Sequence, residues 1–138
     1  FEESLKVAIG KYTFYGKLDR VDILNDNSIR ILDYKTSKSK KSKGYIKKDI
    51  QLAFYSFLMK NIDSDEIEAR IPDVCTLEFV RDSEDPSVDV SFTAADMIEM
   101  GHRIEGIIKS IEKNQFSPKK NATCYFCDYK KLLCPLYK

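Results

Sequence analysis

A short apolar segment of this chain passes directly into charged side chains. Residues 29–34 read IRILDY and are followed by Lys35, so the apolar run ends in a carboxylate and an ammonium. The length and β-branched content of the run predict a short buried strand. Residues two apart on a strand point to the same face, so Asp33 and Lys35 should project together and Tyr34 to the opposite side. Because a buried charge without a partner is costly, this strand must end where its charges are compensated.

The segments around this strand predict a mixed α/β domain with helices packed on a small sheet. Residues 5–24 predict two short strands that turn near Gly10, and the strands around Asp19 and Asp33 should pair antiparallel. A polar loop, a helix, two strands of a hairpin and a second helix should follow, over residues 36–48, 49–61, 74–80, 88–92 and 93–114. Thr93, with Asp96 three residues later, predicts a capping box at the start of the second helix.

Composition sets only wide limits on what the chain can do. Its 138 residues are 43% hydrophobic and 33% charged, which suits one folded domain and argues against disorder. The net charge of +1 does not by itself indicate a nucleic-acid partner. No run reaches the roughly 18 apolar residues that span a bilayer, and no secretory leader is recognisable, so we expect a cytoplasmic protein with no membrane partner. The chain begins at Phe1 rather than Met, and we expect a fragment that lacks its N-terminal part.

Two carboxylates and a lysine near the ends of neighbouring strands have the composition of a metal site. Mg²⁺ prefers one or two carboxylates together with several waters, and Asp19 and Asp33 could supply them. A lysine beside the metal, here Lys35, can orient an attacking water and stabilise charge that develops on a phosphate. A D-x-K triplet arises often by chance, however, and taken alone it more often marks a salt bridge at a strand end.

Three segments together resemble a known nuclease signature. Residues 16–22 (GKLDRVD), 31–37 (ILDYKTS) and 51–55 (QLAFY) are similar to the motifs of RecB-like exonucleases in the PD-(D/E)XK superfamily. The same signature occurs in related iron–sulfur helicase-nucleases and CRISPR-associated nucleases. The resemblance implies a restriction-endonuclease-like α/β core, with a mixed central β-sheet flanked by helices. It further implies a Mg²⁺- or Mn²⁺-dependent exonuclease that hydrolyses DNA in repair or recombination, joined in many relatives to a helicase module or subunit.

The resemblance also implies roles for individual residues. Asp19 and Asp33 would bind the metal together with the backbone carbonyl of Tyr34, and Lys35 would complete the catalytic set. The Q-x-x-x-Y motif of the family matches Gln51 and Tyr55, and their i, i+4 spacing puts both on one helix face. They are implied to help position the lysine and the DNA backbone.

Seven lysines fall within 14 residues, beginning with the lysine of the D-x-K triplet. They are Lys35, Lys38, Lys40, Lys41, Lys43, Lys47 and Lys48. Such a run can contact phosphates without reading bases, although runs of this kind are usually only solvated loops. Because the loop adjoins the D-x-K strand, we expect the six lysines after Lys35 to bind DNA.

Three of the four cysteines lie within the last 15 residues. Cys124, Cys127 and Cys134 have the spacing C-x₂-C-x₆-C, and a C-x₂-C loop can present both sulfurs to one metal. In the family that the chain resembles, three C-terminal cysteines join a distant upstream cysteine to hold a [4Fe–4S] cluster. Here the last spacing is six residues rather than the common five, and the front of the chain carries no fourth cysteine. Cys75, inside an apolar strand, is expected to be a buried structural thiol.

The resemblance of the cysteine segment implies how the domain is organised, but it does not decide which metal the cysteines bind. Residues 1–138 would form a single nuclease domain in which residues 116–138 are a cysteine-rich C-terminal staple. An iron–sulfur cluster in the full-length protein is our first expectation, with zinc or no metal as alternatives.

Two interpretations of a different class stay open. The chain could be a DNA-binding or structural module with an inactive nuclease site, although a decayed site should have lost one of Asp19, Asp33 and Lys35. It could also be a zinc-binding interaction domain built on the C-terminal cysteines, which would leave the aspartates unexplained. For single residues, Tyr55 could be ordinary core and Gln51 a surface residue of its helix.

Overall fold

The computed structural model describes residues 3–37, 42–47, 50–65 and 67–137. The chain divides into two compact units, Phe1–His102 and Arg103–Lys138. The expectation of a single domain with a C-terminal staple stays a prediction.

The first unit begins with a β-hairpin. β1 (Glu3–Ile9) pairs antiparallel with β2 (Tyr12–Leu18), and the chain turns at Gly10 as the sequence predicts. Gly10 has a φ of 59°, a left-handed conformation in which a side chain would be strained. Leu5, Val7 and Leu18 are buried. The hairpin therefore presents one apolar face to the core, and β2 ends directly before Asp19.

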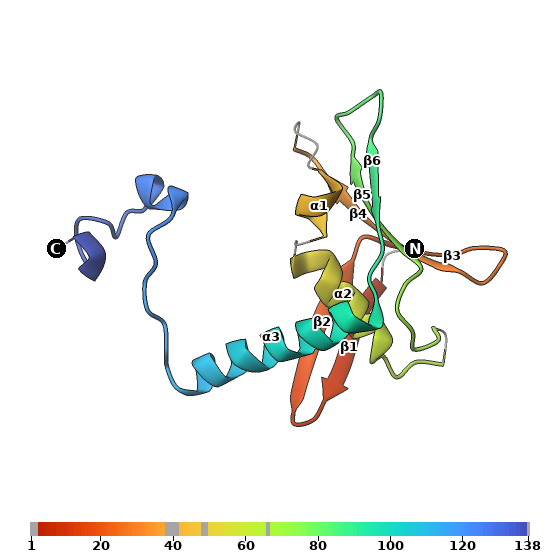
Figure 1. The fold of residues 1–138 in the computed structure, drawn as a ribbon, viewed down its shortest axis with the longest axis horizontal. Coiled ribbons are helices and arrows are strands. Elements are labelled where there is room, and N and C mark those ends of the chain that lie inside the picture. The colour runs from red at the N-terminus through yellow and green to blue at the C-terminus, as the bar shows by residue number, and fades with distance from the viewer. Residues whose placement is uncertain (1–2, 38–41, 48–49, 66, 138) are drawn as a thin grey trace. The chain divides into compact units, whose positions relative to one another are not determined.

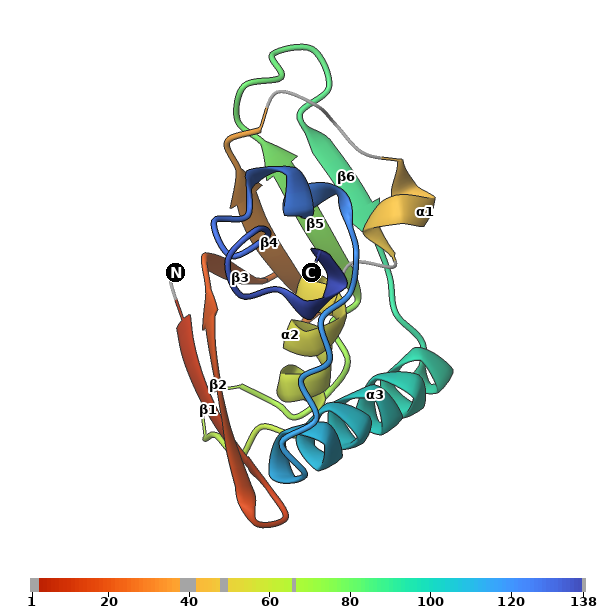
Figure 2. The same ribbon diagram turned by 90° about the vertical axis from the view of Figure 1, so that its left-hand side faces the viewer.

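A four-stranded mixed sheet follows in the first unit (Figures 1 and 2). Its strands are β3 (Arg20–Ile23), β4 (Ile29–Lys35), β5 (Val74–Phe79) and β6 (Ser87–Val90), in that spatial order. β4 pairs antiparallel with β3 and parallel with β5, and β5 pairs antiparallel with β6. The antiparallel pairing expected next to Asp19 and Asp33 is confirmed. β4 is also the buried strand that its apolar run predicts, since Ile31 is fully buried.

Helices connect β4 to β5, because parallel neighbours need a crossover. α2 (Ile50–Lys60) forms where the helical pattern predicts it and buries Leu52, Leu58 and Met59. A Cβ atom at Gly16 of β2 would lie 2.8 Å from Leu58 Cδ1. Glycine at this position therefore allows a close approach between β2 and α2.

The expectation of a loop over residues 36–48 is wrong in its C-terminal part. α1 (Lys43–Ile46) forms there as a single helical turn. The Ser42 hydroxyl accepts a hydrogen bond from the Tyr45 N–H, and Ile46 is buried. A capping side chain and one apolar anchor thus order a segment whose composition indicates a loop. Residues 38–41, 48 and 49 lie outside the described residues.

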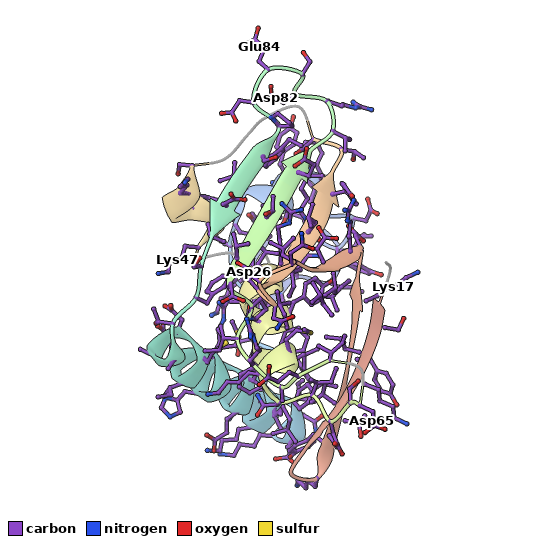
Figure 3. The ribbon with its side chains drawn as sticks, turned by 90° about the vertical axis from the view of Figure 1, so that its right-hand side faces the viewer. Lys17, Asp26, Lys47, Asp65, Asp82 and Glu84 are labelled. Atoms are coloured by element: carbon purple, nitrogen blue, oxygen red, sulfur yellow. The ribbon has the colours of Figure 1, made fainter. Side chains whose placement is uncertain are left out.

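β5 and β6 form the predicted hairpin, but β6 begins and ends earlier than residues 88–92. Its connecting loop carries Asp82 and Glu84 at the tip, so this end of the hairpin is acidic (Figure 3). α3 (Ala94–Glu112) starts after Thr93. The Thr93 N–H and hydroxyl donate to Asp96 Oδ2 at 2.7 and 2.8 Å, and the Asp96 N–H donates to Thr93 Oγ1 at 3.3 Å. The capping box is therefore confirmed.

The second unit contains the C-terminal part of α3 and the tail that follows it. The tail holds two short 3-10 helices, η1 (Ala122–Phe126) and η2 (Pro135–Tyr137). Asn121 caps η1 by accepting a hydrogen bond from the Thr123 N–H at 2.9 Å. Across both units, none of the described helices has the length and apolar character needed to cross a membrane.

Candidate active site

The side chains of Asp33 and Lys35 leave the C-terminal end of β4 on one face of the sheet. Asp33 is only 4% exposed. Lys35 Nζ lies 2.5 Å from Asp33 Oδ2, so an ammonium neutralises the buried carboxylate. Tyr34, between them, is exposed and belongs to the opposite face. The pair offsets a desolvation cost that would reach several kcal/mol for a carboxylate buried alone.

Gln51, near the start of α2, joins this ion pair. Its Oε1 accepts a hydrogen bond from Lys35 Nζ at 2.7 Å, and its Nε2 donates to Asp33 Oδ1 at 2.8 Å. An ammonium can only donate and an ionised carboxylate can only accept, so the two contacts fix the orientation of the amide. Nε2 also donates to the Tyr55 hydroxyl at 3.2 Å, one helical turn further on. The structure thus brings Asp33, Lys35, Gln51 and Tyr55 into one hydrogen-bonded group.

Asp19 lies on the connection between β2 and β3 and is exposed. Its Oδ2 accepts a hydrogen bond from the Tyr34 N–H at 2.9 Å. The paired residues of β3 and β4 begin with Arg20 opposite Leu32, so the Asp19 carboxylate takes a backbone donor beyond the end of that ladder. This contact holds Asp19 beside the peptide that joins Asp33 to Tyr34.

The backbone carbonyl of Tyr34 faces the same side as Asp19. The Lys35 carbonyl accepts a hydrogen bond from the Val80 N–H at 3.1 Å and therefore points toward β5. Successive carbonyls of a strand point in alternating directions, so the Tyr34 carbonyl points toward the β3 side. The Asp19 carboxylate and the Tyr34 carbonyl therefore lie on the β3 side of the end of β4, the strand that also carries Asp33.

Comparisons with known proteins identify the family of the chain and its fold. A family model described as the PD-(D/E)XK nuclease superfamily matches residues 1–135. The chain belongs to this superfamily. The mixed sheet flanked by helices is the restriction-endonuclease-like fold expected of a PD-(D/E)XK protein.

The crystal structure of SSO0001 matches the whole of this PD-(D/E)XK chain with 18% sequence identity and a TM-score of 0.54. A likeness at that identity shows the fold alone. The chain spans 59% of that protein's length. No curated protein matches the chain.

The oxygen atoms at the end of β4 fit the kind of cation that PD-(D/E)XK nucleases use. Within the described residues, no three His, Cys, Asp or Glu side chains are grouped to hold a metal ion. The oxygen atoms at this strand end come from two carboxylates, Asp19 and Asp33, and from the Tyr34 backbone. Mg²⁺ suits such a set, because it binds oxygen ligands, needs only one or two carboxylates and keeps several waters.

Two of the lysines expected to bind DNA lie in the described part of the chain. Lys43 is in α1 and Lys47 follows it, and both are exposed. Lys47 Nζ lies 3.6 Å from Asp96 Oδ2, a surface ion pair that adds little stability. Figure 3 places Lys47 and Lys17 on opposite sides of the first unit. Lys38, Lys40, Lys41 and Lys48 lie outside the described residues, and DNA contact by this segment stays a prediction.

Sequence reasoning missed a second charged group next to the site. Asp22 binds two arginines: Arg20 Nε donates to its Oδ1 at 2.7 Å, and Arg30 Nη2 donates to its Oδ2 at 2.7 Å. The hydrogen bond from Arg20 is the main cause that lowers the pKa of Asp22, and Arg30 lowers it further. The sequence does contain a sign of this group: in residues 19–22 (DRVD), Arg20 and Asp22 are two apart and therefore share a strand face.

Cys75 is the buried thiol that its apolar strand predicts. It is fully buried, and its Sγ lies 3.3 Å from the Ser56 hydroxyl. Burial raises the pKa of Cys75 to about 11, although the hydrogen bond with Ser56 opposes the shift. This thiol is therefore protonated and structural at neutral pH.

The other three cysteines belong to the second unit, around the tyrosine at the end of its tail. Partial loss of hydration and the neighbouring Cys124, Cys134 and Cys127 raise the pKa of Tyr137. These three cysteines are not grouped as metal ligands in the described residues. Binding of iron–sulfur or zinc by Cys124, Cys127 and Cys134 stays a prediction.

Proposed function

We propose that this chain is the nuclease core of a Mg²⁺- or Mn²⁺-dependent deoxyribonuclease of the RecB-like branch. The enzyme would be an exonuclease that removes nucleotides from DNA ends in repair or recombination. One observation carries the proposal: a buried carboxylate, Asp33, is held by Lys35 and Gln51 at the strand end that Asp19 also contacts. The support for the RecB-like branch is the resemblance of the three sequence motifs.

Asp19, Asp33 and the Tyr34 carbonyl would hold the divalent cation. When bound, the cation would supply positive charge against the phosphate and make an attacking water more acidic. The Asp33 carboxylate would meet it with its charge and direction already set by Gln51. Neither carboxylate would need a large rearrangement, because each is already fixed by a hydrogen bond.

Lys35 would orient the attacking water and stabilise charge on the scissile phosphate. Its ammonium has three N–H donors, and among the described residues Asp33 and Gln51 take two of them. The remaining donor can meet a water or a phosphate oxygen. The side chain is 29% exposed, so a substrate can reach it. Gln51 and Tyr55 would act through Lys35, by holding its side chain in place.

Several finer parts of the proposal rest on the resemblance alone. They are a helicase module or subunit as partner, and an iron–sulfur cluster on Cys124, Cys127 and Cys134 in the full-length protein. The lysines after Lys35 would contact the DNA backbone. A cytoplasmic location stays a prediction.

The test uses the full-length protein with linear and covalently closed circular DNA in Mg²⁺ or Mn²⁺. An exonuclease shortens the linear DNA and leaves the circle intact. Lys35→Ala should lower the rate at least about 100-fold, because the charge it removes is opposite the developing negative charge. Lys60→Ala, at the exposed end of α2, makes the same chemical change away from the site and should cut normally. A protein that binds DNA but cuts neither substrate would instead be the inactive module.

A further inference from the structure

The hairpin of β1 and β2 has an outer face that points away from α2. Its inner face packs on that helix: the ring centroids of Phe14 and Phe54 lie 6.1 Å apart, and Gly16 approaches Leu58. Side chains alternate along a strand, so the residues between the inward ones point outward. All of these outward residues are exposed, and they are Ser4, Lys6, Ala8, Thr13, Tyr15 and Lys17.

The strand register gathers three of them into one group, called here the Tyr15 face: Lys6, Tyr15 and Lys17. Lys6 lies directly opposite Tyr15 in the register, and such cross-strand neighbours have Cβ atoms about 4.5–5.5 Å apart. Lys17 is the next outward residue of β2 and therefore a diagonal neighbour of Lys6, at about 7–8 Å. The Tyr15 side chain is 70% exposed. An open aromatic ring is thus flanked by two ammonium groups.

The chemistry of the Tyr15 face matches that of an unpaired nucleic-acid strand. None of the outward residues of the hairpin is acidic, so this face carries positive charge only. Lysines attract phosphates without reading bases. An exposed aromatic ring stacks on the flat face of a base, which an unpaired strand offers and a duplex keeps inside its own stack. The face therefore fits single-stranded rather than double-stranded DNA.

The Tyr15 face leads along β2 to the candidate active site. β2 ends at Leu18, directly before Asp19, and Figure 3 shows Lys17 on the side of the hairpin away from α2. Tyr15 precedes Asp19 by four residues, which span no more than about 14 Å of extended chain. One DNA strand advances about 3.4 Å per nucleotide in a duplex, so about four nucleotides cover this distance. A strand held at Tyr15 can consequently reach the carboxylate of Asp19.

We propose that the Tyr15 face binds the single-stranded end of the DNA substrate. Tyr15 stacks on one base, and Lys6 and Lys17 contact the phosphates on either side of it. The inference rests on the proposed function and deepens it, because it names single-stranded DNA as the form that the enzyme takes up. Tyr15 and the two lysines bind the strand and do not touch the reacting atoms.

The first measurement is DNA binding by the full-length protein in buffer without divalent cations, so that cleavage does not interfere. Fluorescence anisotropy follows a labelled oligothymidylate. Tyr15→Ala should weaken binding about 5- to 150-fold, the range found when a stacking aromatic side chain is replaced by alanine. Tyr15→Phe keeps the ring and should bind like wild type. Binding of a blunt duplex should be the same in all three proteins.

The second measurement tests the lysines through the salt dependence of the same binding. Lys6→Ala/Lys17→Ala should reduce the slope of log K against log salt concentration by about 1.4, because each phosphate contact on a single strand contributes about 0.7. Lys60→Ala, which removes an exposed lysine from the end of α2, should leave the slope unchanged. This measurement does not depend on the fold of the Tyr15 variants.

The third measurement is cleavage of single-stranded DNA with Mn²⁺. Tyr15→Ala should raise KM and leave kcat close to wild type, because the lost contact is the same in the ground state and the transition state. A fall in kcat with an unchanged KM would contradict a binding role.

The outcomes separate this inference from the nuclease proposal. Oligothymidylate binding that is unchanged in Tyr15→Ala and keeps its salt slope in the double lysine variant would overturn the Tyr15 face and leave the nuclease proposal intact. Equal weakening of duplex and single-strand binding would overturn the preference for single strands. A protein whose oligothymidylate binding depends on Tyr15 and both lysines, but which cuts no DNA with Mg²⁺ or Mn²⁺, would support the binding face and overturn the nuclease proposal.

Discussion

Replacing Lys35 with Met should destabilise the fold as well as abolish cleavage. The variant leaves the Asp33 carboxylate, which is 4% exposed, without the ammonium that neutralises it. Breaking a buried ion pair from one side costs about 3–5 kcal/mol. Gln51 still donates to Asp33 in the variant, and Lys35 is partly open to solvent. We therefore expect a loss of about 2–4 kcal/mol in the free energy of unfolding.

The double variant Asp33→Asn/Lys35→Met isolates the cause of that loss. It removes both charges, so no uncompensated charge remains in the core, and it should be more stable than Lys35→Met alone by about 1–3 kcal/mol. Urea unfolding at pH 7, followed by circular dichroism because the chain has no Trp, measures the free energy for each variant. Lys60→Met serves as the exposed control and should lie within about 0.5 kcal/mol of wild type. The single variant Asp33→Asn completes the set. If the losses of Asp33→Asn and Lys35→Met add up to the loss of the double variant, an uncompensated charge is not the cause and the reasoning is refuted.

Three further predictions follow from other parts of the fold. Gly16→Ala should cost about 1–3 kcal/mol of unfolding free energy in urea, because its Cβ would lie 2.8 Å from Leu58 Cδ1; an unchanged midpoint would contradict that close approach. Asp22→Asn should destabilise the protein at pH 7 and progressively less as the pH falls below 3.8, because the folded state lowers the pKa of Asp22 and its stabilising charge is lost on protonation; a pH-independent difference would argue against it. Cys75 should resist iodoacetamide at pH 8 in the folded protein, because burial raises its pKa to about 11, whereas exposed Cys127 should react after chelator treatment; mass spectrometry of the labelled peptides separates the two.

Local sequence patterns predicted most elements of this fold. The turn at Gly10, the capping box at Thr93 and the helical pattern of residues 49–61 each depend on neighbours within a few residues, so they could be found without tertiary information. The helical turn α1 at residues 43–46, where the sequence predicted a loop, could not be found in this way. A single helical turn is marginal alone, and this one depends on burial of Ile46 against the rest of the first unit.

The sequence by itself determined that Asp33 and Lys35 share a strand face and that Gln51 and Tyr55 share a helix face, because the periods of strand and helix settle both. Only the tertiary structure decided that these two faces meet, with the amide of Gln51 between the ammonium and the buried carboxylate. It also decided that the Asp19 carboxylate accepts a hydrogen bond from the Tyr34 N–H. Such contacts join segments 15 or more positions apart. The packing of the whole domain selects among many alternatives that local preferences leave equal in energy.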